Sequence, residues 1–130
     1  MNVQARHSLR FRQLPGVFAV CKLPSKASVP ESDDTFFALT RAPDETSFVC
    51  PENAAPENAL VENGWICFQL HGPFPFNMTG VLASFISPLA EASIPIFAVS
   101  TYDTDYVLVK QQERERAISV LGAAGHELLS

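Results

Sequence analysis

The second half of the chain, residues 64–130, contains strand-like and helix-like segments in an order that few folds accept. Apolar alternation predicts strands at 65–71, 95–100 and 106–110, and a short last strand within 126–130. Apolar residues at helical spacing predict helices over 80–92 and 113–124. The resulting order βαββαβ is the ferredoxin-like split βαβ pattern, so an α+β fold is expected.

The two predicted helices carry different end signals. Asn77 or Thr79 offers a side-chain oxygen that could cap the first helix. Pro88 falls inside that helix and should weaken one backbone hydrogen bond near Ser84. Gly125 is suited to end the second helix, because glycine adopts the left-handed conformation that often follows a helix.

The first half is less regular. Strand-like runs at 8–14, 16–23, 35–41 and 45–50 are separated by a Pro-Gly turn, a polar connection over 24–34 and a hairpin turn at Ala42-Pro-Asp44. A second polar connection, 51–62, leads to the second half. We interpret residues 1–63 as a degenerate copy of the same unit with shortened helices, and 64–130 as the complete one, with sheets packed side by side.

Composition narrows the class of protein. With 130 residues, 47% hydrophobic and 18% charged, the chain is long enough for one globular domain or two very small ones. The net charge is −5, and Arg6, Arg10 and Arg12 are the nearest approach to a basic group, so nucleic-acid binding is not expected. No signal peptide or long apolar span appears, which predicts a cytoplasmic protein that does not enter membranes.

Three cysteines, at 21, 50 and 67, are too far apart in sequence for a metal or redox motif. Each lies in an apolar, strand-like run. We expect buried thiols that pack as small hydrophobic side chains.

Two loops of the second half are rich in polar and special residues and are expected to face the same way. The segment 72–80 leads into a helix, whose free N–H groups and positive dipole end suit a carboxylate. The segment 100–105 carries Asp103 and Asp105, which can accept from an ammonium or guanidinium group or can bond their own turn. Neither loop holds a nucleophile–base pair, so no catalysis and no cofactor are expected.

Other side chains near these loops allow weaker hypotheses. His71 with Asp103 or Asp105 could suggest a metal site, but a lone histidine at a strand end is usually structural, so no metal is expected. His7 and His126 belong to no recognisable group of functional residues. Phe74 and Phe76 could form an apolar patch that pairs with another unit or covers a sheet edge.

The residues 80–109, above all Ser100-Thr-Tyr-Asp-Thr-Asp-Tyr106, resemble the ACT domain. They are similar to the ACT branch shared by small bacterial proteins and the arginine-sensing CASTOR proteins, and residues 37–50 resemble the N-terminal region of the same group. Ser93 stands where this family often has glycine.

The resemblance implies a regulatory module that pairs side by side and binds amino acids where two ACT units meet. Carried onto this chain, it implies contacts from the helix start, which are Thr79, Gly80, Val81 and Leu82. It also implies contacts from the turn, which are Thr101, Tyr102 and Asp105.

The leading hypothesis is therefore a non-catalytic, allosteric amino-acid sensor, with a homodimer as the expected assembly and a cationic ligand suggested by the acidic turn. The alternative is an interaction module that binds no ligand and pairs with an enzyme or regulator. A small enzyme is the least supported hypothesis, because the sequence offers no base and nucleophile within reach.

Overall fold

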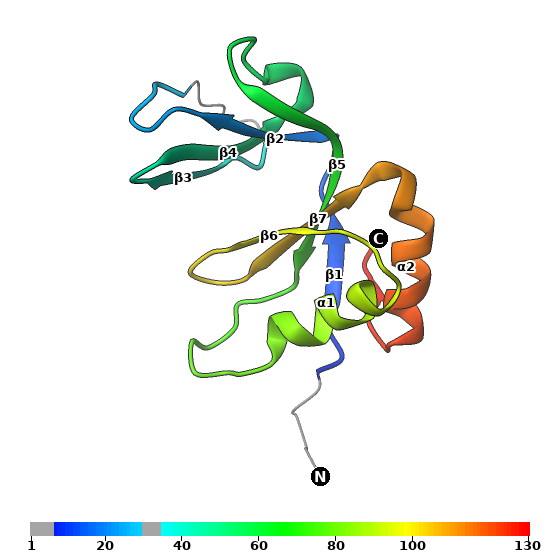
Figure 1. Cartoon of the computed structure of the whole chain (residues 1–130). Coiled ribbons are helices and arrows are strands. Elements are labelled where there is room, and N and C mark those ends of the chain that lie inside the picture. Colours follow the sequence, from blue (N-terminus) through cyan, green and yellow to red (C-terminus); the bar gives the residue numbers. More distant parts are fainter. Residues whose placement is uncertain (1–6, 30–34) are drawn as a thin grey trace. The chain divides into compact units, whose positions relative to one another are not determined.

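A computed structural model describes residues 7–29 and 35–130, and it divides into two compact units (Figure 1). The first, here called the discontinuous unit, combines the N-terminal residues up to Leu14 with Cys67–Ser130. The second, here called the inserted unit, is Pro15–Ile66. Arg6 of the expected basic group and residues 30–34 of the expected connection lie outside the described residues.

Strands account for most of the regular structure in the described residues. In chain order the elements are β1 (Arg10–Gln13), β2 (Phe18–Leu23), β3 (Ala38–Ala42), β4 (Glu45–Pro51), the 3-10 helix η1 (Glu52–Ala54), β5 (Leu60–Leu70), α1 (Val81–Glu91), β6 (Phe97–Ser100), β7 (Asp105–Lys110), the 3-10 helix η2 (Gln111–Glu113), α2 (Arg114–Ala123) and β8 (Glu127–Leu128).

The discontinuous unit contains a sheet with the strand order β8-β1-β5-β7-β6. From β5 to β8 its elements follow the predicted βαββαβ order. The N-terminal strand β1 joins this sheet, antiparallel to β5 with Phe11 opposite Leu70, and parallel to β8 with Arg10 opposite Glu127. A strand from the start of the chain therefore separates β5 from β8.

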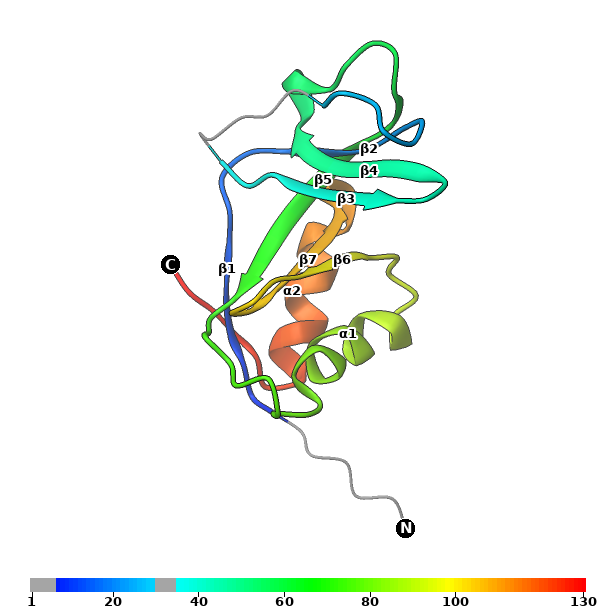
Figure 2. The same cartoon turned by 90° about the vertical axis from the view of Figure 1, so that its left-hand side faces the viewer.

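Helices α1 and α2 lie side by side on one face of this sheet (Figures 1 and 2). Three aromatic rings join α1 to the strands beneath it. Phe85 of α1 is fully buried, and its ring centroid lies 5.0 Å from Phe11 and 6.4 Å from Phe68. Because burying a phenylalanine stabilises a fold by roughly 1.5–3 kcal/mol, this cluster is a main anchor of α1.

Both helices end in the same hydrogen-bonded motif. After α2, the N–H of Gly125 donates to Gly122 and the N–H of His126 donates to Leu121, the two bonds of a Schellman motif. Gly125 has φ 98°, as expected for the residue that ends this helix. After α1, the left-handed position is taken by Ser93, with φ 58°.

The start of α1 differs from the sequence-based expectation. The N-cap residue is Gly80, with φ 80°, and no side chain caps the helix. The prediction that Asn77 or Thr79 would be the cap is therefore wrong. A left-handed glycine, which turns the chain sharply into α1, occupies the capping position.

The inserted unit is an antiparallel sheet with the strand order β3-β4-β2-β5. Its β3–β4 hairpin turns where predicted, with Ala42 opposite Glu45. Strand β5 begins at Leu60, five residues before the predicted start at Trp65. Gly64 lies within this strand with φ 84°, close to a shift in the pairing of β2 with β5. A β-bulge accommodates such a residue without ending the strand.

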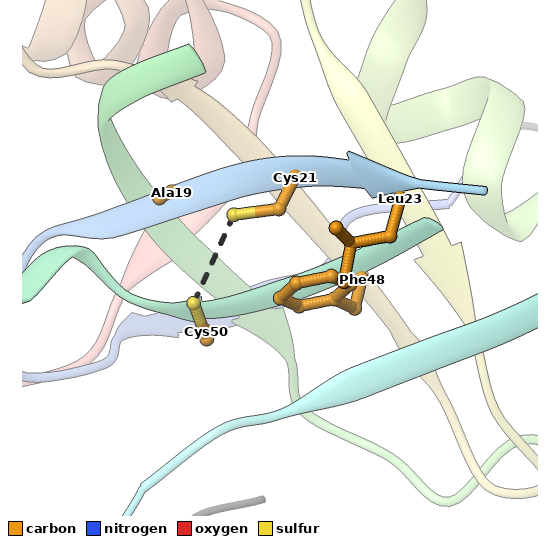
Figure 3. Close-up of a cluster of buried hydrophobic side chains, with 5 residues drawn as sticks. All are labelled: Ala19, Cys21, Leu23, Phe48 and Cys50. Atoms are coloured by element: carbon orange, nitrogen blue, oxygen red, sulfur yellow. Dashed lines mark hydrogen bonds between the residues drawn. The ribbon is translucent and has the colours of Figure 1, made fainter. Parts of the chain in front are cut away.

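The core of the inserted unit lies between β2 and β4 (Figure 3). Its buried side chains are Ala19, Cys21, Leu23, Phe48 and Cys50. All three cysteines of the chain are free and buried, as predicted, and the Sγ atoms of Cys21 and Cys50 are 4.0 Å apart. Burial, followed by the neighbouring Cys50, raises the pKa of Cys21 to about 12, so this thiol stays protonated at neutral pH.

The α+β, ferredoxin-like fold class predicted from the sequence is confirmed. The division into domains after residue 63, and the interpretation of the first half as a degenerate copy, stay predictions. No α-helix occurs in the inserted unit among its described residues. Among the helices that the structure describes, none has the length and apolar character needed to span a bilayer.

Candidate functional site

The two polar loops singled out in the sequence are in direct contact. The N–H of Phe74, in the loop before α1, donates to the carbonyl of Asp103, in the β6–β7 turn, at 2.8 Å. The Thr104 hydroxyl donates to the carbonyl of Leu70, at the end of β5, at 2.7 Å. A Cβ added to Gly72 would lie only 2.9 Å from the Asp103 carbonyl oxygen, so glycine permits this close approach. The expectation that both loops face the same way is confirmed.

The β6–β7 turn is held by its own hydrogen bonds. The N–H of Thr101 donates to the carbonyl of Thr104 at 2.8 Å, and the Thr101 hydroxyl also donates to that carbonyl at 3.1 Å. The hydroxyl of Ser100 donates to the carboxylate of Asp105, which lies directly opposite it in the β6–β7 pairing. These bonds fix the turn before any ligand arrives, and they orient the carboxylate of Asp105.

Two aromatic rings stand out from the surface beside this turn. Tyr102 is 80% exposed and Phe76 is 75% exposed, and their centroids are 4.7 Å apart in an edge-to-face arrangement. Met78, from the same loop as Phe76, is also exposed. The sequence had singled out Phe76 only together with Phe74, and loop residues give no periodic signal that could have paired it with Tyr102.

The start of α1 provides the other predicted contacts. Thr79 is exposed, Gly80 and Leu82 are partly buried, and the Val81 side chain belongs to the core. Because no side chain caps α1, its first N–H groups are not claimed by a capping residue. Val81 could therefore contact a ligand through its backbone only.

An open cavity of about 820 Å³ runs between α1 and α2, and it begins at the start of α1. Thr79 and Gly80 line it, together with Ser84, His7 and His126. The predicted turn residues do not line this cavity. The structure thus brings the seven predicted residues to one end of the discontinuous unit, but only two of them to the cavity itself.

The sequence predicted no role for the two histidines of this region, His7 and His126. The His7 ring donates from Nε2 to the carbonyl of Thr79 at 2.8 Å, and its backbone N–H donates to the Ser84 hydroxyl at 3.1 Å. The His126 ring bonds the carbonyl of Ser84. Both histidines therefore contact Ser84 or its neighbourhood at the start of α1, while their lack of a functional role stays a prediction. Separated by more than a hundred positions, they gave no spacing signal.

Two titratable side chains near these loops, His71 and Tyr106, differ in their surroundings. His71 is exposed, and within the described part of the chain no three His, Cys, Asp or Glu side chains form a group able to hold a metal ion. Burial is the main cause that raises the pKa of Tyr106, whose hydroxyl accepts a hydrogen bond from Gln69 at 3.2 Å. A phenol with a raised pKa stays protonated at neutral pH and can donate a hydrogen bond.

Comparison with known families gives two matches along the chain. A model of the ACT domain matches residues 60–123. A second model, of an N-terminal domain, matches residues 16–58.

Curated relatives from animals match about two thirds of the chain. The bovine cytosolic arginine sensor for mTORC1 subunit 1 is 28% identical over 97 residues, which are 66% of this chain and 30% of that protein. Human CASTOR3P is 29% identical over 91 residues, or 60% of this chain and 56% of that protein. This chain therefore spans about a third to a half of the length of these relatives.

Solved structures give a match over nearly the whole chain. A crystal structure of a protein from Agobacterium tumefaciens is 37% identical, with a TM-score of 0.88, and the match covers 95% of this chain and 93% of that one. The aspartate kinase of Clostridium acetobutylicum, at 11% identity and a TM-score of 0.66, shares the fold over 95% of this chain and 36% of its own. Together with the matched family model and the βαββαβ order of the discontinuous unit, these similarities show that the chain belongs to the ACT-domain family.

Proposed function

We propose that this protein is a non-catalytic regulatory protein that binds an amino acid at the surface formed by the start of α1 and the β6–β7 turn. The observation that carries the proposal is the contact between the two loops, made by Phe74 and Asp103. With this contact, a helix start without a side-chain cap and an oriented carboxylate, Asp105, would form one binding surface. The first suits an α-carboxylate, and the second suits a cation.

A second ACT unit would complete this surface. The rings of Tyr102 and Phe76 are too exposed to be explained by the core of their own unit, and aromatic side chains are enriched where proteins associate. We therefore propose a homodimer with the amino acid at the interface between ACT units. Binding would favour one packing of these units over another, which is the physical basis of allosteric regulation.

The relatives support the ligand class and the compartment. Because the bovine relative is named as a cytosolic arginine sensor, a cationic amino acid is the first ligand to test, and a cytoplasmic location is proposed for this chain as well. The carboxylate of Asp105 is consistent with a cation, although every free amino acid also carries an ammonium group.

A thermal-shift screen with the twenty amino acids tests the proposal. A ligand at a hundred times its dissociation constant should add about 2.7 kcal/mol to the unfolding free energy. If no amino acid shifts the unfolding temperature at millimolar concentration, the sensor hypothesis fails.

Two pairs of variants locate the site. Asp105→Asn should lower the affinity for a cationic ligand by about tenfold or more, because hydrogen bonds to charged groups contribute roughly 1.5–3 kcal/mol. Asp44→Asn, which changes an exposed aspartate in the β3–β4 turn, is the matched control. Tyr102→Ala should also weaken binding, whereas Leu60→Ala, at another exposed apolar position, should not. Equal affinity in Asp105→Asn, Tyr102→Ala and the controls would refute the placement.

The second candidate function is an interaction module without a ligand. The exposed Tyr102–Phe76 pair favours it, since two rings at 80% and 75% exposure form an apolar surface of the kind that marks protein contacts. Sedimentation of the wild type and of Tyr102→Ala, without amino acids, separates the two. Constitutive dimers that Tyr102→Ala dissociates, with no response to any amino acid, would favour the interaction module.

A further inference from the structure

The ring of His126 connects three elements of the discontinuous unit. The Schellman motif at the end of α2 turns the chain so that this side chain is buried, at 6% exposure. Its ring centroid lies 5.4 Å from that of Phe85, in α1. The same ring contacts the residue that precedes β1, so α1, α2 and the N-terminal strand meet at one imidazole.

The two ring nitrogens have opposite roles. The backbone N–H of Leu9 can only donate, and it lies 3.0 Å from Nδ1, so Nδ1 is an acceptor. The carbonyl of Ser84 can only accept, and it lies 2.8 Å from Nε2, so Nε2 carries the proton. Only the neutral imidazole protonated at Nε2 makes both bonds.

Pro88 explains why α1 needs this donor. In a regular helix the carbonyl of Ser84 would accept from the N–H of residue 88, but proline has no N–H. The imidazole of His126 supplies the missing donor from outside the helix. The sequence analysis expected a weakened bond at this point of α1, and the structure shows what replaces it.

Protonation of His126 would remove the acceptor of Leu9. In the charged ring both nitrogens carry hydrogen, so the N–H of Leu9 would face another N–H instead of a lone pair. An unpaired buried amide is costly, and the strain falls where β1 enters the sheet next to α1.

Other charged or titratable side chains lie near the His126 ring. His7 and Glu91 line the same cavity, and Arg10 and Glu127 lie exposed on the adjoining strands β1 and β8. The His7 ring only donates, to Thr79, so a proton added to His7 leaves that bond intact.

We propose that His126 is an acid-sensitive latch that holds the N-terminal strand and α1 together. In its neutral state it fixes α1, and in its protonated state it releases Leu9 and loosens the contact between β1 and α1. The latch does not require that the unit bind an amino acid. Protonation of this ring is thus expected to cost the region local order.

Nuclear magnetic resonance of the ¹⁵N-labelled wild type tests the latch directly. At pH 8 the ring nitrogens of His126 should show the form protonated at Nε2. On acidification to pH 5, the Leu9 amide signal and the Nδ1 signal should change together. The protection of the Leu9 amide from exchange, corrected for intrinsic rates, should fall about tenfold or more. The proposal would be overturned by a ring protonated at Nδ1 at pH 8. It would also be overturned if the signal and the exchange protection of the Leu9 amide do not change with acid.

Variants supply a second test. His126→Gln keeps one donor and one acceptor but cannot titrate. The exchange protection of the Leu9 amide in this variant should therefore not fall with acid. His7→Gln and His71→Gln, which change the other two histidines, should keep the acid response of the wild type. If His126→Gln responds to acid as the wild type does, the latch is refuted. If that variant does not fold, the wild-type measurement decides alone.

Discussion

The two Schellman motifs of the discontinuous unit allow a paired test of backbone strain. Both helices end with a left-handed residue, Ser93 after α1 (φ 58°) and Gly125 after α2 (φ 98°). A residue other than glycine destabilises the folded state by about 1–2 kcal/mol in this conformation. Glycine removes that strain, but it costs about 0.5–1 kcal/mol itself, because it loses more conformational freedom on folding. Ser93→Gly should therefore stabilise the protein by about 0.5–1 kcal/mol.

The reverse change should destabilise the other motif. Gly125→Ser introduces the same strain, and the added Cβ would lie 3.3 Å from the Ser8 hydroxyl oxygen, which is a tight contact. We expect a loss of at least about 1 kcal/mol. Ser93 has an exposed side chain, so no buried contact is lost when it is replaced.

Thermal and urea unfolding measure both effects. For a chain of this size, 1 kcal/mol corresponds to a shift of roughly 3–5 °C in the unfolding temperature. Gly122→Ser is the matched control, because Gly122 is within α2 and nothing lies within 4 Å of an added Cβ. A serine there should be neutral or stabilising. Lower stability of Ser93→Gly, or unchanged stability of Gly125→Ser, would refute this reasoning.

Three further outcomes follow from the core. Deletion of residues 1–14 should abolish cooperative unfolding of the discontinuous unit, measured by circular dichroism, because β1 separates β5 from β8. Phe85→Ala should cost about 3–5 kcal/mol in urea unfolding, since the ring is fully buried. Burial raises the pKa of Cys67 from 9.0 to about 12, so its contribution to stability is complete below pH 9 and declines as the pH rises towards 12. Stability measured against pH over this range should fall less steeply in Cys67→Ala.

The order of elements could be predicted because the spacing of apolar residues within each segment indicates a helix or a strand. The helix expected over 80–92 is Val81–Glu91, and the helix expected over 113–124 is Arg114–Ala123. The place of β1 could not be predicted in this way. Alternation identifies a strand but not its partner, and β1 pairs with residues more than fifty positions away along the chain.

The candidate site was likewise predicted only in part. That the two loops face the same way was predicted, but the hydrogen bond that joins them, from Phe74 to Asp103, was not. The bonds that decide how each side chain is used were not foreseen. Asp105 is oriented by Ser100, which lies opposite it across the β6–β7 pairing, and such a bond depends on a register that the sequence does not state.

Pro88 links the fold to the proposed function. A proline in the third turn of α1 would ordinarily weaken the helix, yet here it leaves one carbonyl available for a side chain from the end of α2. Because Ser84 also bonds Gly80, through its hydroxyl at 2.6 Å, the same residue contacts both His126 and the start of α1. The position of the first turn, which we propose binds the ligand, is thus connected through one serine to the protonation state of one histidine. A ligand that orders the start of α1 should in turn favour neutral His126, because coupling between two binding equilibria acts in both directions.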